Sequence, residues 1–447
     1  MKIKEFTYYY FIGIGGIGMS ALARYFVKLE KTVLGYDKTK TKLTEKLISE
    51  GMNIHFEDNI SEIPNSLNPS NTLIVYTPAI SPNHSEFDYF KENKFKIVKR
   101  SEVLGEITKS TTCLAVAGTH GKTTTSSILG HILKVANLAS TALVGGIVEN
   151  YNSNLIFGGD KISVVEADEF DRSFLKLNPD FACITSTDAD HLDIYGHKEE
   201  LEKAFEEFGK LVTQKLFVRK GIQIENAWSY AVEEIADYYA DNIQLKEDYF
   251  TFDFTFPQGK FKVIQMNLPG RHNIENAVAA IAMSLEMGVS ESDIRKALQS
   301  FQGIQRRFSR FISDKKIIID DYAHHPTELN AIIRATKNFY PNKSILGVFQ
   351  PHLFSRTRDF GEEFAQSLAE LENLILIEIY PARELPIDEI NSDWLADKIE
   401  KLNSKRPEVV RLENAEIEIQ KHSTDIILLM GAGNIDTLYE PLKQKFS

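Results

Sequence analysis

The stretch AVAGTHGKTTTSS, residues 115–127, is a glycine turn that determines how the middle of the chain folds. The run CLAVA (113–117) before it predicts a buried strand, and TTSSILGHILKVA (124–136) predicts a helix. Lys122 and the hydroxyl of Thr123 stand where that helix begins. A strand, a glycine turn, a lysine and hydroxyls at a helix N-terminus form the phosphate-binding loop of many ATP-using proteins.

The turn is two residues shorter than that loop normally is. Gly118 and Gly121 enclose two residues instead of four, and Val116 occupies the position of the expected first glycine. The residues that bind phosphate in such a loop are still present, since Lys122 can contact the β- and γ-phosphates and Thr123 can bind Mg²⁺. We therefore predict an ATP-type phosphate site, and the alternative is an N-capped helix with a solvated lysine.

A second glycine-rich stretch, FIGIGGIGMSALA (11–23), lies near the start of the chain. Gly13, Gly15 and Gly18 fit the G-x-G-x-x-G pattern between a strand and a helix, and Asp37 follows at the end of the next strand. The pattern predicts a pyrophosphate site in which Asp37 accepts a ribose hydroxyl. NAD in a dehydrogenase, another diphosphate nucleotide, and glycines that serve only tight packing all remain open at this point.

Acidic residues follow two further strands. Glu166, the first residue of EADEFD, comes at the end of an apolar run. A second group follows the strand at 181–185: Asp188, Asp190, His191 and Asp193. The carboxyl ends of parallel strands open on one edge of a sheet, where ligands bind. Carboxylates with an imidazole suit Mg²⁺, so we predict a metal site there. Taken singly, each acid also fits a cap or a solvated turn.

Composition restricts the class of protein. The chain has 447 residues, 43% hydrophobic and 26% charged, so we expect about three soluble domains. A net charge of −12 argues against nucleic acid or an anionic membrane as partner. Cys113 and Cys183 lie in apolar runs and read as reduced core thiols. Neither a signal peptide nor an apolar run of about 20 residues is present, which predicts no membrane insertion and a cytoplasmic location.

Strand-like and helical patterns alternate along most of the chain, which predicts an α/β fold with mainly parallel sheets. We expect domain boundaries near residues 107 and 303. YFTFDFTFPQGKFKVIQM (249–266) alternates with period two and predicts an antiparallel hairpin, and NIENAVAAIAMSLEMG (273–288) predicts an amphipathic helix. The apolar runs KKIIIDDYA, KSILGVFQ, NLILIEIY and DIILLMGAG predict the strands of the last part.

Six motifs occur together in one order: GTHGKTTT, EADEFD, DADHLD, PGRHNIENA, RRF and DDYAHHPTE. With FIGIGGIGMSALA at the start and FQPHLFSRTRDF late, the chain resembles the Mur ligases over nearly its whole length. The resemblance implies three domains: a Rossmann-like UDP-sugar domain (1–107), a central P-loop ATPase-like domain (108–303), and a Rossmann-like ligase domain (304–447). The last would close over ATP and substrate.

The resemblance also implies an activity. An enzyme of the alanine-adding branch would join L-alanine to UDP-N-acetylmuramate in peptidoglycan precursor synthesis, using ATP and Mg²⁺ and an acyl phosphate intermediate. A recycling ligase that attaches a whole tripeptide to the same sugar is the nearest alternative. A dehydrogenase that uses the first loop and a non-catalytic nucleotide sensor are alternatives from other classes.

The resemblance assigns roles to individual positions. For the UDP-sugar it implies Gly13, Gly15, Gly16, Ile17, Gly18, Asp37, Tyr322, His324 and Arg356. For ATP it implies Gly118, Thr119, His120, Gly121, Lys122, Thr123, Thr124, His272, Asn273 and Asn276. Thr123, Glu166 and His191 would bind the metal, and the catalytic set would be Lys122, Glu166, His191, Arg307 and Asp321.

Two positions depart from the family pattern. Ser186 stands where the family often has asparagine, and Leu353 stands where many relatives have a basic residue. Some relatives also use a carbamylated lysine, and the sequence offers no clear match for one.

Overall fold

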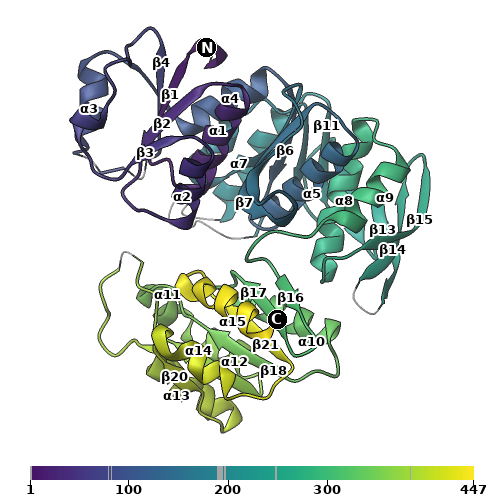
Figure 1. Cartoon of the computed structure of the whole chain (residues 1–447). Coiled ribbons are helices and arrows are strands. Elements are labelled where there is room, and N and C mark those ends of the chain that lie inside the picture. Colours follow the sequence, from purple (N-terminus) through teal and green to yellow (C-terminus); the bar gives the residue numbers. More distant parts are fainter. Residues whose placement is uncertain are drawn as a thin grey trace. The chain divides into compact units, whose positions relative to one another are not determined.

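The computed structural model describes residues 3–78, 80–81, 83–188, 195, 198–246, 249–382 and 384–447. The chain forms two compact units, which we call the first unit (Met1–Gln302) and the second unit (Gly303–Ser447). Two of the three sheets lie in the first unit and one in the second (Figure 1). Over the part of the chain that the structure describes, every helix is too short or too polar to cross a membrane.

The N-terminal sheet of the first unit has five parallel strands in the order β3-β2-β1-β4-β5. They are β1 (Tyr8–Ile12), β2 (Thr32–Tyr36), β3 (Asn53–His55), β4 (Thr72–Tyr76) and β5 (Lys96–Lys99). The helices are α1 (Ile17–Lys28), α2 (Lys42–Ser49), α3 (Ser85–Glu92) and α4 (Arg100–Lys109). Alternate residues of β1 face opposite cores: Tyr9 stacks on Phe26 of α1, and Tyr10 packs against Phe90 of α3.

The second sheet of the first unit has ten strands in the order β15-β14-β13-β12-β11-β10-β6-β9-β7-β8. Its parallel centre contains β6 (Thr112–Ala117), β9 (Ile162–Ala167), β10 (Phe181–Ile184), β11 (Lys215–Arg219) and β12 (Trp228–Val232). Its outer strands are β7 (Ser140–Val148), β8 (Ser153–Phe157), β13 (Tyr238–Leu245), β14 (Phe250–Phe256) and β15 (Gly259–Met266). Its helices are α5 (Lys122–Val135), α7 (Lys198–Lys210), α8 (Arg271–Glu286) and α9 (Glu291–Ser300).

This sheet confirms the predicted hairpin, since β14 pairs antiparallel with β15, and α8 confirms the predicted helix. Sequence patterns did not reveal the antiparallel pair β7–β8 at the other edge. That edge packs on α1, where Asn154 of β8 donates to the carbonyl of Ile17 and accepts from the guanidinium of Arg24. Arg24 is buried and also pairs with Glu50, so polar contacts tie the two sheets into one unit.

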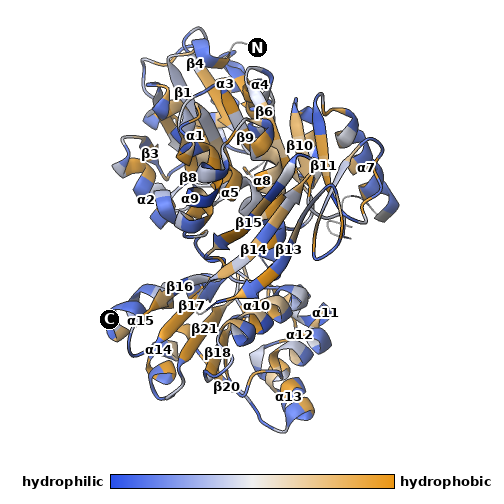
Figure 2. Cartoon of the chain, turned by 90° about the vertical axis from the view of Figure 1, so that its right-hand side faces the viewer, coloured by the Kyte–Doolittle hydropathy of each residue, from blue (hydrophilic) through white to orange (hydrophobic). Residues whose placement is uncertain are grey.

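The second unit contains one six-stranded sheet in the order β16-β17-β21-β18-β19-β20, in which only the β16–β17 pair is antiparallel. The strands are β16 (Ser309–Ile312), β17 (Ile317–Asp321), β18 (Ile345–Phe349), β19 (Asn373–Ile377), β20 (Glu408–Val410) and β21 (Ile426–Met430). The helices are α10 (Pro326–Phe339), α11 (Phe354–Asp359), α12 (Gly361–Leu368), α13 (Ser392–Asn403), α14 (Leu412–Gln420) and α15 (Tyr439–Phe446). Strands β17, β18 and β21 are mostly hydrophobic, whereas α13 and α14 carry a hydrophilic face (Figure 2). Apolar cores therefore cover both faces of this sheet.

The predicted fold class is confirmed, because alternating strands and helices build three mainly parallel sheets. The predicted boundary near residue 107 falls inside α4, whose last residue, Lys109, is separated from β6 by only two residues. The division into domains 1–107, 108–303 and 304–447 stays a prediction.

Candidate functional site

The turn between β6 and α5 adopts a backbone that only glycine allows. Gly118 has φ +125° and Gly121, which precedes the first residue of α5, has φ +83°. A Cβ on Gly118 would lie 2.2 Å from the hydroxyl of Thr185, and one on Gly121 would lie 2.7 Å from the side-chain oxygen of Asn276. Within the turn, the N–H groups of Thr119 and His120 donate to Ser186, and α5 begins directly after Gly121, so the anion-attracting N-terminus of this helix lies at the turn.

We predict that Gly118→Ala destabilises the first unit and weakens phosphate binding. The added methyl group meets backbone as well as side chain, since the amide nitrogen of Ser186 would lie 2.7 Å away. Gly221→Ala is the matched control, because Gly221 has φ +101° but open space around its Cβ position. In urea unfolding, we expect Gly118→Ala to cost at least about 2 kcal/mol more than the control, the typical cost of overpacking. Equal midpoints for the two variants would contradict this.

Lys122 lies across this turn. Its Nζ donates to the carbonyl of Gly118 at 2.6 Å and to both carboxylate oxygens of Glu169 at 2.8 and 2.9 Å. Glu169 has no exposed side-chain surface, whereas Lys122 is 17% exposed. Burial raises the pKa of the Glu169 carboxyl, and the charge of Lys122 opposes that shift. Glu169 lies within EADEFD, but no role was predicted for it, because nothing in the neighbouring sequence marks it as buried.

Thr123 and Glu166, two of the three predicted metal-binding residues, meet beside the turn. The Thr123 hydroxyl donates to one Glu166 oxygen at 3.1 Å, and the Ser126 hydroxyl lies 3.3 Å from the other. A carboxylate and a hydroxyl at the carboxyl end of a parallel strand are donors that Mg²⁺ accepts, so the residues present fit that ion. The third predicted metal residue, His191, lies outside the described residues, as do Asp190 and Asp193.

The predicted ATP residues of α8 lie against the same turn. Asn276 accepts from the Thr125 hydroxyl at 3.2 Å and donates to Asn273, and Asn273 donates to the carbonyl of Pro269 at 2.6 Å. The bond from Thr125 to Asn276 joins α5 to α8, and Asn273 holds the start of α8 through its bond to Pro269. His272 lies at the start of α8, directly after Arg271.

Ser186, the first departure from the family pattern, supports the loop. Its hydroxyl lies 2.7 Å from that of Thr119 and accepts from the backbone N–H of His120 at 2.8 Å. His120 in turn approaches Asp188, with Nε2 4.0 Å from the carboxylate. A short hydroxyl therefore stabilises the turn at the position where an asparagine is common in the family.

The first glycine loop has the expected geometry, and Asp37 is engaged within it. One Asp37 oxygen accepts from the backbone N–H of Gly15 at 2.7 Å, and the other accepts from Thr39 at 3.0 Å. Helix α1 begins at Ile17 directly after Gly16, so the positive end of its dipole lies at this loop. The role of Asp37 toward a ribose stays a prediction, and its observed effect is to hold the loop.

Arg100 is a basic residue at this loop that sequence reasoning missed. A Cβ on Gly18 would lie 2.8 Å from the Arg100 guanidinium, which also approaches the Asp168 carboxylate at 3.8 Å. Arg100 directly follows the fifth parallel strand, and such strands deliver ligand-binding residues to their carboxyl ends, so its role becomes visible once this strand is placed in the sheet.

In the second unit, Asp321 ends β17 and organises the RRF turn. Its two oxygens accept from the backbone N–H groups of Phe308 at 2.8 Å and Ala323 at 2.9 Å. Asp321 keeps some accessible surface, but protein surrounds most of its carboxyl, and this burial raises the pKa to about 6 against the opposing effects of both N–H groups and Arg307. Arg306 and Phe308 have φ near +60°, which marks the turn as strained.

The three predicted substrate-side residues of the second unit lie in one cluster. Tyr322 and His324 have ring centroids 5.3 Å apart, His324 and His352 are 6.0 Å apart, and Arg356 donates to Nδ1 of His352 at 3.2 Å. His352 was not predicted from the sequence. Burial and the charge of Arg356 lower the pKa of its imidazole to about 4. Leu353, the second departure from the family pattern, has φ +72° at the start of α11.

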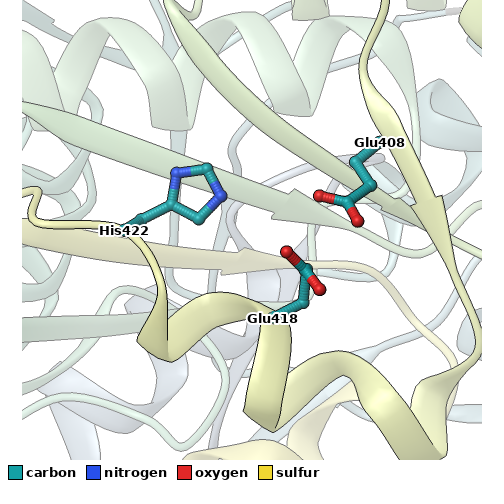
Figure 3. A group of neighbouring side chains, drawn as sticks. All are labelled: Glu408, Glu418 and His422. Atoms are coloured by element: carbon teal, nitrogen blue, oxygen red, sulfur yellow. The ribbon is translucent and has the colours of Figure 1, made fainter.

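A further group of side chains, Glu408, Glu418 and His422, lies within 4.8 Å of one another (Figure 3). Glu408 begins β20, and His422 lies in the connection before β21. They therefore lie at the amino-terminal edge of the sheet, opposite to Asp321 and His352. The ammonium group of Lys421 already forms an ion pair with Glu418 at 2.5 Å, so this carboxylate has a positively charged partner within the protein.

These features define an α/β nucleotide-binding protein with a shortened phosphate loop and a separate glycine loop. Family models match along the chain: the Mur ligase family catalytic domain at residues 8–112, the Mur ligase middle domain at 116–284, and the Mur ligase glutamate ligase domain at 306–433. The chain belongs to the Mur ligase family.

Its relatives are similar over their full lengths. The UDP-N-acetylmuramate–L-alanine ligases of Flavobacterium johnsoniae and Christiangramia forsetii are 52% and 50% identical, with 99% of this chain and 99% and 98% of theirs covered. The crystal structure of UDP-N-acetylmuramate–alanine ligase from Thermotoga maritima matches with a TM-score of 0.84 and 25% identity over 98% of each chain. Membership in this family confirms the predicted resemblance and the predicted class of enzyme, an ATP-dependent ligase that forms an amide bond, over a dehydrogenase or a nucleotide sensor.

Proposed function

We propose that the protein joins L-alanine to UDP-N-acetylmuramate in an ATP-dependent reaction that forms an amide bond, in the cytoplasm and as a step of peptidoglycan precursor synthesis. The observation that carries the proposal is the second loop, where Lys122, the Thr123 hydroxyl and the Glu166 carboxylate meet at one helix N-terminus. The names of the similar enzymes support this choice of sugar and amino acid.

Each of the two glycine loops binds a different nucleotide. The second loop carries Lys122 and the Thr123–Glu166 pair, which suit a triphosphate with Mg²⁺. The first loop, Gly13–Gly18, has no lysine within it and has Arg100 beside it, which suits a diphosphate held without reaction. We therefore assign ATP to the second loop and the UDP part of the sugar nucleotide to the first.

The chemistry requires that a carboxylate be activated before an amine can attack it. Transfer of the γ-phosphoryl group of ATP to the sugar carboxylate gives an acyl phosphate, and the amine of L-alanine then displaces phosphate. Two anions at 4 Å repel by about 4 kcal/mol at an effective dielectric of 20. Lys122 offsets part of this repulsion, and Mg²⁺ held by Thr123 and Glu166 would neutralise phosphate charge. The roles of His191, Arg307 and Asp321 in the reaction remain assignments from the family.

The test is ADP release by the purified protein with UDP-N-acetylmuramate and Mg²⁺. We expect release with L-alanine and little with other amino acids. L-Ala-γ-D-Glu-diaminopimelate as the preferred amine would establish the recycling alternative instead. Absorbance change at 340 nm with NAD, without need for ATP, would overturn the ligase proposal.

A further inference from the structure

Glu169 is a fully buried carboxylate that the proposed reaction does not use. It follows β9 and precedes the 3₁₀ helix η4 (Phe170–Lys176). Its side chain has no exposed surface and accepts two hydrogen bonds from Lys122. Since a buried carboxylate is costly unless it is paired, this pair is a built feature of the loop and not a chance surface contact.

Hydrogen bonds to the protein use all the donor positions of the Lys122 ammonium group. An ammonium group has three protons, and those of Lys122 have three acceptors: the carbonyl of Gly118 and the two oxygens of Glu169. A phosphate anion that binds in the turn must therefore take at least one of these hydrogen bonds from the protein.

The backbone of Glu169 is itself held in place. Its carbonyl accepts from the Tyr195 hydroxyl at 2.6 Å and from the N–H of Arg172 at 3.0 Å. Phe174, in the same 3₁₀ helix, stacks on Phe208 of α7 with ring centroids 5.0 Å apart. The backbone that carries the carboxylate is thus fixed, so we expect Lys122 to be the partner that moves when a phosphate enters.

We propose that Glu169 is a positioning residue that holds Lys122 against its own loop and competes with the nucleotide phosphates for it, which limits the affinity of the second loop. The proposal rests on the proposed function for the identity of the phosphate ligand as ATP or ADP. Neutralising the carboxylate while keeping its shape, as in Glu169→Gln, frees the lysine for the ligand.

Calorimetric titration of ADP with Mg²⁺ tests the competition. We expect Glu169→Gln to bind ADP about tenfold more tightly than the unmodified protein. In a Lys122→Ala background, we expect the same Glu169→Gln change to give no gain, because no lysine remains to be freed. Weaker or equal binding by Glu169→Gln would overturn the proposal. An equal gain without the lysine would also overturn it, since simple repulsion between carboxylate and phosphate would then explain the effect.

A second readout does not need nucleotide. Acetylation of Lys122 by an amine-reactive ester, followed by peptide mass spectrometry, reports whether Glu169 holds the ammonium group. We expect at least a fivefold faster rate in Glu169→Gln, with Lys134 on the same helix as internal reference, and an unchanged rate would count against the proposal. If the unmodified protein binds no ADP, the proposed function fails, and the acetylation rates still decide the role of Glu169.

Discussion

Lys122→Ala is expected to lower the rate of ADP release at least about a hundredfold, with UDP-N-acetylmuramate affinity near normal. The physical reason is that a preorganised cation beside a reacting phosphate contributes two to three orders of magnitude in comparable sites. The sugar nucleotide is assigned to the first loop, which does not involve Lys122. Steady-state kinetics and calorimetric titration of the sugar nucleotide provide the two measurements.

The same substitution also changes stability, which supplies a control. Removing Lys122 leaves Glu169 buried without its cation, and breaking such a pair typically costs about 3 kcal/mol. The double variant Lys122→Ala/Glu169→Gln removes both charges, so we expect stability to recover while activity stays lost. Lys134→Ala, on the same helix, should leave the rate unchanged. Loss of sugar-nucleotide binding in Lys122→Ala would refute the assignment of the two loops.

Glu166→Gln is expected to lower the rate about a hundredfold at a Mg²⁺ concentration that saturates the unmodified protein. Mg²⁺ prefers charged oxygen ligands, and an amide supplies a neutral oxygen in the same place. The variant should therefore require at least about tenfold more Mg²⁺ for half of its maximal rate. A Mg²⁺ titration of ADP release measures this directly.

Glutamine has nearly the shape of glutamate, so Glu166→Gln removes the charge without changing the size of the side chain. The amide oxygen can still accept from the N–H of Gly145 while the amide nitrogen donates to the Thr123 hydroxyl, so the loop should keep its geometry. Glu206→Gln on α7, where the side chain is exposed, is the matched control and should show the Mg²⁺ dependence of the unmodified protein. An unchanged Mg²⁺ requirement in Glu166→Gln would remove Glu166 from the metal site.

Local sequence patterns were sufficient to predict many of the strands and helices. Strand β9 and the hairpin of β14 and β15 occur where periodicity predicted them, because alternating or continuous apolar runs between turns have few other solutions. The pair β7–β8 was missed, since antiparallel pairing at a sheet edge depends on a partner strand and not on either sequence alone.

For the site as well, the sequence indicated some features and the structure alone revealed others. Gly118 and Gly121 mark a turn in the sequence, and the structure shows that both have positive φ. Asp37 looked available for a ribose, but it accepts hydrogen bonds from its own loop. Arg100 and His352 could be found only once the strands that carry them were placed in their sheets.

The sequence alone determined the α/β class, the two glycine loops and the family, because these depend on residue types at fixed spacing within short segments. Only the tertiary structure decided that Glu169 is buried against Lys122, that Ser186 supports the loop, and that Asn154 and Arg24 tie two sheets together. Burial and hydrogen bonding between residues far apart in the chain are products of packing, and no local pattern of residues encodes them.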